Sequence, residues 1–241
     1  MEFNIFDIYT DASINLDEKL GCAGMVLVDR RRDQILDAQY FVINNATNNM
    51  SEIIAIWMGI HKAVSLLYTE SLAFQVNLFS DSQISLFGMR EWMPNWIRKR
   101  KGDILINSVG PVANQDWFVD AYHAILSSGL KIKFFHQKGH VDETNPNSLF
   151  VCEKQFRTSN PNSLHMIGST AQIISKYNNY VDATTRDIVI GILNGIDISN
   201  FHNARYLCNI PFAYDIDNQQ LIQYQSQIKG GLNYPINFNG G

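Results

Sequence analysis

Residues 3 to 43 read FNIFDIYTDASINLDEKLGCAGMVLVDRRRDQILDAQYFVI, and their pattern is the main indication of the fold class. Three segments of it, residues 3 to 10, 21 to 29 and 34 to 43, are short and rich in aromatic and β-branched side chains, as strands are. The polar segments between them are short enough for hairpin connections. The sequence therefore predicts that the chain opens with three consecutive antiparallel strands.

The rest of the chain alternates between helices and strands. From residue 50 to residue 67 the apolar side chains recur at helical spacing, which predicts a helix capped by Asn49 or Ser51. Further strands are expected over residues 73 to 80 and 130 to 136, and further helices over 82 to 89, 91 to 97, 114 to 126 and 179 to 193. This order predicts an α/β fold with a five-stranded mixed sheet, three strands antiparallel and two parallel, flanked by helices.

Composition narrows the class of protein. The 241 residues suit one or two domains, and no run approaches the ~18 apolar residues of a membrane span. Three cysteines at wide spacing argue against a disulfide framework or a CxxC zinc site. The first ten residues lack a basic segment, so no secretory signal is visible and we expect a cytoplasmic protein. Because the net charge is −4, a polyanionic partner would need a local basic patch.

Two aspartates follow strands that are expected to lie side by side. If the first and fourth strands are parallel neighbours, Asp11 and Asp81 emerge at the same edge of the sheet. Glu52, in the first turn of the intervening helix, can point to that edge too, although turn formation or capping would explain each acid alone. Three converging carboxylates repel one another unless a cation lies between them. Oxygen ligands without His or Cys select Mg²⁺ or Mn²⁺ over Zn²⁺.

Six short motifs follow one another along the chain. They are TDAS (residues 10 to 13), TNNMSE (47 to 52), SDSQ (80 to 83), WMPNWIRKRKGDILINSVGPVANQDW (92 to 117), KGH (138 to 140) and NNYVD (178 to 182). In this order they resemble the motifs of ribonuclease H type 1, and the fourth resembles the basic handle of the bacterial enzymes. The resemblance implies a ribonuclease H-like fold and hydrolysis of the RNA strand of RNA/DNA hybrids, leaving 5′-phosphate ends.

The resemblance also assigns roles to residues. It implies that two Mg²⁺ ions, with Mn²⁺ as a substitute, are held by four carboxylates: Asp11, Glu52, Asp81 and Asp182. His140 would assist proton movement or product release. The residues implied in substrate binding are Thr47 at a DNA-strand phosphate, Asn48, Asn49 and Gln83 in the minor groove, and Trp92, Trp96, Arg98, Lys99, Arg100 and Lys101 in the handle. For the amides, ordinary turn and cap chemistry is the alternative, and for the handle a solvated charged face.

The chain departs from the family pattern in two places. Between His140 and Asp182 lie 41 residues, which we interpret as an insertion at about 143 to 176 that forms a surface excursion. Asp142 and Glu143 are closer alternatives for the fourth ligand, but they lie on what should be a mobile loop. Residues 200 to 241 form an extension beyond a ribonuclease H domain at 1 to 199. It has seven aromatic residues and few charges, so it should pack on the domain or on an unidentified protein partner.

Two other functions use the same fold. One is a nuclease that acts on another nucleic acid, against which the TNN and handle matches count. The other is a structural or assembly protein without activity, which the loss of a central carboxylate would have favoured. All four carboxylates are present.

Overall fold

The computed structural model describes residues 4–160, 171–207 and 236–237, and its centre is one mixed sheet. The first three strands form an antiparallel meander, and two further strands add parallel to the first. The predicted five strands are β1 (Asn4–Asn15), β2 (Leu20–Asp29), β3 (Gln34–Asn44), β4 (Phe74–Ser80) and β5 (Ile132–His136). Their order across the sheet is β3-β2-β1-β4-β5.

The sheet has seven strands rather than the five expected. The additions are β6 (Ala204–Tyr206), parallel to β3 at one edge, and β7 (Ile236–Asn237), parallel to β5 at the other. Each is too short to give a strand pattern in the sequence, and its pairing depends on an edge formed by distant residues. Both belong to the C-terminal extension, which therefore joins the sheet in its described part. Residues 208–235 of that extension lie outside the described residues.

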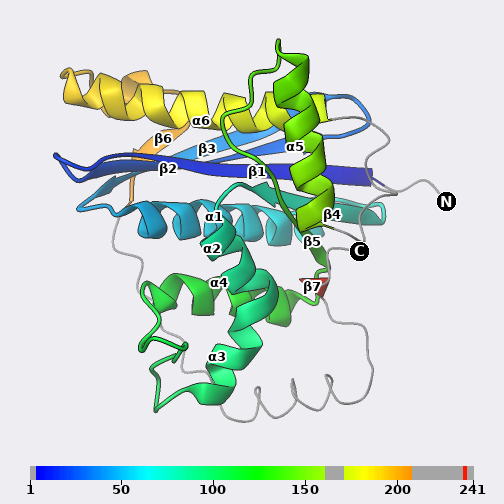
Figure 1. Cartoon of the computed structure of the whole chain (residues 1–241), viewed down its shortest axis with the longest axis vertical. Coiled ribbons are helices and arrows are strands. Elements are labelled where there is room, and N and C mark those ends of the chain that lie inside the picture. Colours follow the sequence, from blue (N-terminus) through cyan, green and yellow to red (C-terminus); the bar gives the residue numbers. More distant parts are fainter. Residues whose placement is uncertain (1–3, 161–170, 208–235, 238–241) are drawn as a thin grey trace.

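Helices cover both faces of the sheet (Figure 1). On one face lie α1 (Asn48–Thr69) and α4 (Gln115–Ser128), and the chain between them forms α2 (Gln83–Phe87), the π-helical turn η1 (Gly88–Trp92) and α3 (Met93–Lys99). On the other face lie α5 (Pro146–Ser159) and α6 (Ala171–Leu193), followed by the 3-10 turn η2 (Ile198–Asn200). The two helices expected over residues 82 to 97 are thus one uninterrupted helical stretch, in which a π turn takes the place of a break.

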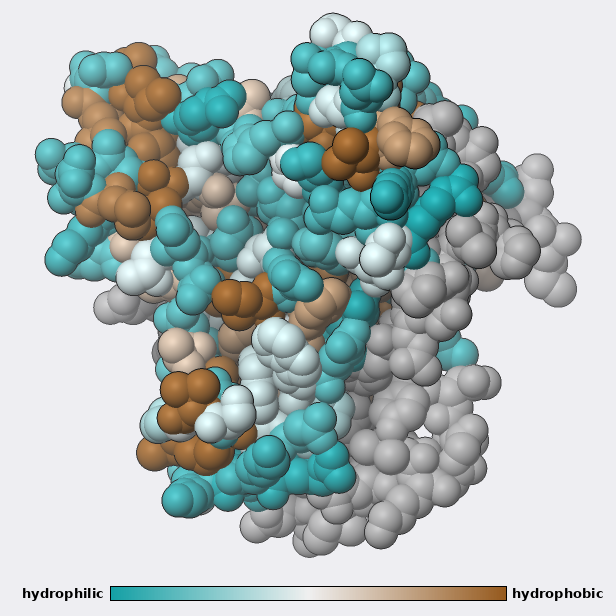
Figure 2. All heavy atoms as spheres, in the orientation of Figure 1, coloured by the Kyte–Doolittle hydropathy of each residue, from teal (hydrophilic) through white to brown (hydrophobic). Residues whose placement is uncertain are grey.

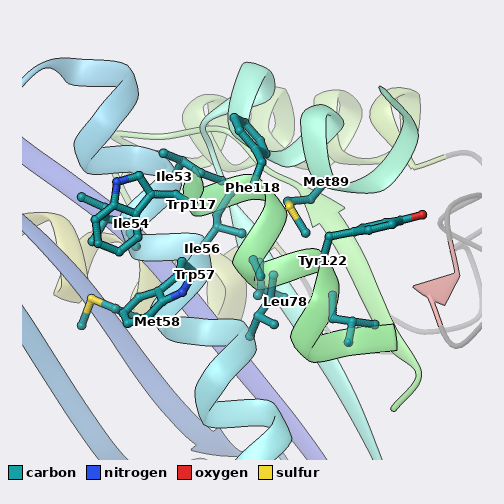
Figure 3. Packing of buried hydrophobic residues seen from close by; sticks show 14 of the residues in the cluster. Ile53, Ile54, Ile56, Trp57, Met58, Leu78, Met89, Trp117, Phe118 and Tyr122 are labelled. Atoms are coloured by element: carbon teal, nitrogen blue, oxygen red, sulfur yellow. The ribbon is translucent and has the colours of Figure 1, made fainter. Parts of the chain in front are cut away.

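The larger core lies between the sheet and α1 with α4. Figure 3 shows Trp57 and Ile53 of α1 beside Trp117 and Phe118 of α4. The α1 helix is long and apolar enough to cross a membrane by length and composition alone, yet 61% of its apolar window is buried against the protein. Such burial is what a core helix packed on the face of a sheet requires.

Two element boundaries differ from expectation in ways that affect the site. Strand β1 continues to Asn15 because it pairs with β2 from Phe6 to Asn15, so Asp11 lies within the strand rather than after it. Helix α1 is capped by Thr47, whose Oγ1 accepts from the Met50 amide at 3.3 Å, and not by the expected Asn49 or Ser51.

The insertion is not only a surface excursion. It contains α5, which Asn145 caps, and whose Cys152 and Phe156 are buried. Its last residues form the first turns of α6, which begins at Ala171 and not at 179. Apolar residues recur along residues 146 to 159, but they form only a narrow hydrophobic face of the helix. The residues that this face packs against lie on distant strands, so the local pattern alone did not indicate the helix.

Candidate metal centre and nucleic-acid interface

Asp11 and Asp81 lie where the parallel pairing of β1 and β4 stops. The last pair of that ladder joins Thr10 to Ser80, and the two aspartates are the next residues along the chain, Asp11 within β1 and Asp81 just after β4. The Thr10 hydroxyl donates to the Phe79 carbonyl at 3.1 Å, which fixes the two strand ends against each other. The register therefore sets both carboxylates at one edge, as parallel strands predict.

Glu52 reaches the same edge from α1. It lies one turn inside the helix, since α1 begins at Asn48, rather than in the first turn as expected. The helix can approach the sheet closely because Gly59 has no side chain: a Cβ there would lie 2.9 Å from the Thr10 methyl group. One carboxylate oxygen from each of Asp11, Glu52 and Asp81 lies within 4.8 Å of the other two.

The electrostatics of these three groups favour a bound cation. Burial raises the pKa of Asp11 and of Glu52 well above the usual carboxylic acid range, and the neighbouring carboxylates raise both further. Burial also raises the pKa of Asp81, although His140 and Lys138 oppose that shift. Glu52 Oε2 is buried without a hydrogen-bond partner among the described residues. A divalent ion would supply the missing partner and offset the repulsion, so this all-oxygen donor set fits a hard cation.

Asp182 lies beside this group of three. It is on α6, only 9% exposed, and its charge raises the pKa of each of the other carboxylates. One oxygen of Asp182 lies 3.2 Å from His140 Nδ1 and 3.5 Å from an Arg186 nitrogen. A hydroxyl pair 3.0 Å apart, Ser13 on β1 and Thr185 on α6, holds the helix against the sheet.

The alternative fourth ligands point elsewhere. Asp142 is exposed, and its carboxylate accepts from the amide and the hydroxyl of Thr144. Glu143 accepts from the Asn179 side chain at 2.8 Å. Among the described residues, neither belongs to the carboxylate group that contains Asp11.

The loop after β5 carries His140 over the site. The imidazole is 75% exposed, and His140 has a left-handed backbone with φ of 51°. Gly139 packs so closely against Asp81 that a Cβ at that position would overlap the Asp81 carboxylate. Sequence reasoning did not single out Gly139 or Arg186. The signal for Arg186 was its position four residues after Asp182, a spacing at which helical charges pair.

The polar residues expected to bind substrate lie next to the carboxylates in the chain and face solvent. Thr47, Asn48 and Asn49 are exposed at the start of α1, and Gln83 is exposed at the start of α2. Thr47 already serves as the α1 cap, which gives it a structural role whether or not it meets a phosphate.

The basic handle is exposed but its tryptophans are not. Arg98, Lys99 and Lys101 face solvent and Arg100 is half-buried. Figure 2 shows hydrophilic residues along the lower end of the molecule, where Figure 1 places α3. Trp96 contradicts our expectation of a flat binding surface, since it is 8% exposed and packs edge-on against Phe118 at 5.3 Å.

Trp92 and Trp117 also pack inward. Trp92 is half-buried between Phe87 and Trp96, and Trp117 is buried against Trp57. Core packing explains the spacing of these tryptophans, because that spacing places them on the inner faces of helices that pack into the main core.

Comparisons with known proteins agree with the site. The family model for RNase H matches residues 4–149. The chain is 30% identical over 135 residues to the ribonuclease H of Haemophilus influenzae (strain 86-028NP), a match that covers 56% of this chain and 78% of the relative. It is 36% identical over 97 residues to the ribonuclease H of Prochlorococcus marinus (strain NATL1A), covering 40% of this chain and 54% of that protein.

Among solved structures, RNase H1 from the archaeon Halobacterium salinarum NRC-1 matches 55% of this chain and 84% of its own, with 19% identity and a TM-score of 0.39. That TM-score is too low to add to the assignment, which rests on the sequence matches. The family match covers more than half of the chain and contains Asp11, Glu52 and Asp81. This chain therefore belongs to the RNase H family.

Proposed function

We propose that this chain is an endonuclease that hydrolyses the RNA strand of RNA/DNA hybrids with bound Mg²⁺ or Mn²⁺ and leaves 5′-phosphate ends. One observation carries the proposal: carboxylate oxygens of Asp11, Glu52 and Asp81 lie within 4.8 Å of one another, at the end of the β1–β4 ladder of an RNase H family member. One buried and two half-buried acids with raised pKa values have little structural use at the edge of a sheet, and they make an effective cation site.

The carboxylates would hold two ions, with Asp182 contributing from the side. Bound there, the divalent ions would activate water and stabilise the charge that develops on the phosphate. The protein's part is to fix the donors. Asp11 and Asp81 are set by the register of two paired strands, and Glu52 and Asp182 by helices packed on opposite faces of the sheet. Ligands on such rigid elements keep their geometry as the substrate enters.

His140 is the candidate proton carrier. Its Nδ1 faces an oxygen of Asp182, and a carboxylate only accepts, so Nδ1 is assigned the proton in that contact. This leaves Nε2 free to take up or release a proton near the reacting phosphate. Because the side chain is largely exposed, it can follow the substrate and product.

Substrate recognition would use two separate surfaces. The exposed amides of Asn48, Asn49 and Gln83 can donate to and accept from sugar and base edges in the minor groove, where 2′-hydroxyls identify RNA. The cations of residues 98 to 101, of which Arg98, Lys99 and Lys101 are exposed, would bind the backbone phosphates further along the duplex. The buried Trp96 has no part in this binding surface.

The test is the cleavage of three labelled duplexes, RNA/DNA, RNA/RNA and DNA/DNA, each with Mg²⁺ and with EDTA. We expect cleavage of the RNA strand of the hybrid alone, and only with Mg²⁺. Cleavage of another duplex would favour a nuclease of the same fold with a different substrate. Absence of cleavage in all three, with either Mg²⁺ or Mn²⁺, would favour the structural or assembly function.

A further inference from the structure

The inserted helix α5 docks where β5 ends, next to the strand that leads to Asp81. Phe156 of α5 is 3% exposed, and its ring centroid lies 5.8 Å from that of Phe135 on β5 and 6.4 Å from that of Phe79 on β4. Cys152, one turn earlier, is fully buried near Ser175 of α6. The insertion is therefore part of the packed core on this face of the sheet.

Asn160, which ends α5, takes the place of a neighbouring strand at the end of β5. Its side chain is fully buried; Nδ2 donates to the His136 carbonyl at 2.7 Å, and Oδ1 accepts from the His136 amide at 3.1 Å. Among the described residues, β7 pairs with Ile132 and Lys133 and not with His136, where Asn160 supplies the ladder bonds. Two backbone groups that would otherwise be buried without partners are thereby satisfied.

The side chain of His136 continues this connection toward the metal centre. Its Nε2 lies 3.2 Å from the backbone carbonyl of Asp81, and its Nδ1 lies 3.1 Å from the Ser159 hydroxyl on α5. Since a carbonyl only accepts, Nε2 must carry the hydrogen, and in the neutral ring Nδ1 then accepts from Ser159. The ring is 6% exposed, so packing holds it in this orientation.

The same short segment holds Asp81 from a second side. The backbone amide of Gln137, the residue after His136, donates to the Ser80 carbonyl at 3.1 Å. Gly139 lies so close to the Asp81 carboxylate that a Cβ there would overlap it. The backbone and the carboxylate of Asp81 are thus both in contact with residues 136 to 139, whose position depends in turn on α5.

We propose that His136 is a positioning residue, which transmits the docking of α5 to Asp81 and so fixes this candidate metal ligand. The inference rests on the proposed function, but it concerns a contact that the family match does not assign. Outer hydrogen bonds that orient a metal ligand typically change metal affinity or activity by ~10- to 100-fold when they are removed.

The test compares His136→Gln with His136→Asn in the full chain. A glutamine amide nitrogen can take the place of Nε2 and donate to the Asp81 carbonyl, whereas an asparagine amide is shorter and reaches only the position of Nδ1. Four quantities are measured: Mn²⁺ affinity by calorimetry without substrate, kcat and KM on a labelled hybrid, and melting temperature. Ser159→Ala, which removes only the partner of Nδ1 on α5, is the third variant.

We expect His136→Asn to weaken Mn²⁺ binding and to lower kcat by about 10-fold or more, with KM within about twofold, and His136→Gln to recover most of both losses. Ser159→Ala should fall between the parent and His136→Asn.

Equal Mn²⁺ affinity and kcat in all variants, with only the melting temperature lowered, would overturn the positioning role. If the parent binds Mn²⁺ but cuts no hybrid, the proposed function fails while the affinities still test His136. If His136→Asn does not fold, Mn²⁺ affinity and kcat of Ser159→Ala equal to those of the parent would overturn the inference.

Discussion

His140 Nδ1 lies 3.2 Å from a carboxylate oxygen of Asp182, although 41 residues separate the two in the chain. Helix α5 lies within that separation: the backbone amide of Asn145, which precedes it, donates to the Asp142 carbonyl at 3.2 Å, and Asn160 follows it at the end of β5. The long insertion is therefore compatible with a direct contact between His140 and Asp182.

His140→Ala should lower turnover by about one to two orders of magnitude and leave Mn²⁺ affinity unchanged. The imidazole would move a proton, and such help typically contributes ~10²- to 10⁴-fold, of which water and the ions replace a part. The control is His140→Asn, since asparagine tolerates the left-handed backbone at this position but cannot carry the proton. Single-turnover rates and melting temperatures are measured on the same preparations. A rate within twofold of the parent in either variant would exclude the proton-carrying role.

Asp182→Asn should cost orders of magnitude in rate, and Asp142→Asn should cost little. Asp182 is buried beside the three carboxylates on a helix, while Asp142 is exposed and bonded within its own loop. A ligand held by a helix keeps its position, so its loss removes a preorganised donor. Cleavage rates over a range of Mg²⁺ concentrations check this ranking. The opposite ranking would mean that the insertion has moved the fourth ligand to Asp142.

Changing Arg98, Lys99, Arg100 and Lys101 together to alanine should weaken hybrid binding without blocking cleavage at saturating substrate. For every cation that no longer binds a phosphate, the slope of log affinity against log salt should fall by about one. The control changes Arg31 and Arg32, two exposed cations on the β2–β3 turn, to alanine. Affinities are measured from about 50 to about 200 mM salt, a range over which phosphate binding weakens measurably. If both sets of variants keep the salt slope of the parent, residues 98 to 101 form only a solvated face.

The metal-free protein should lose stability as pH rises. Burial and neighbouring carboxylates raise the pKa of Glu52 in the folded state, so this state holds the Glu52 proton more tightly than the unfolded chain does. The stability that follows is present below the unfolded-state pKa and is lost as pH rises from about 4 toward the raised value. Glu52→Gln has no charge to bury, and it should melt higher than the parent at pH 7 in EDTA.

The expected difference in melting temperature between Glu52→Gln and the parent depends on the length of the chain. For a chain of this length, each kcal/mol of relieved charge burial raises the melting temperature by about 2–4 °C. Thermal melts in EDTA from pH 5 to about 8 measure it, and Glu18→Gln, an exposed acid, is the matched control. Added Mg²⁺ should stabilise the parent more than Glu52→Gln, since a bound ion favours the folded state. A parent whose melting temperature rises with pH would contradict the assigned burial of charge.

Local patterns were sufficient to predict the positions of Asp11 and Asp81. Both follow from the strand pattern, because parallel neighbours bring equivalent residues to one edge, and the observed register does so. The amphipathic stretch around Asp182 likewise predicted a helix, which the structure contains as α6. These features depend on periodicity within one segment, which a sequence displays directly.

Features that depend on distant partners were not predictable in the same way. The position of Trp96 in the sequence fits both a core residue and an exposed binding platform. Its contact with Phe118 in the structure shows that it is a core residue. The bonds between Asn160 and His136 join residues whose proximity no local pattern encodes. Strands β6 and β7 are shorter than any strand signal, so they could be found only from the edges that they pair with.

The most direct test of the metal-centre proposal is the single-turnover cleavage of a 5′-labelled RNA strand in an RNA/DNA hybrid by the parent and by Asp11→Asn across a range of Mg²⁺ concentrations. Asp11 is buried among the other carboxylates, and its removal takes a donor from the centre of the group without removing a side chain from the core. We predict Mg²⁺-dependent cleavage by the parent, none in EDTA, and a loss of nearly all activity in Asp11→Asn with the fold retained. Cleavage by Asp11→Asn at the parent's rate, or cleavage by the parent that persists in EDTA, would contradict the account.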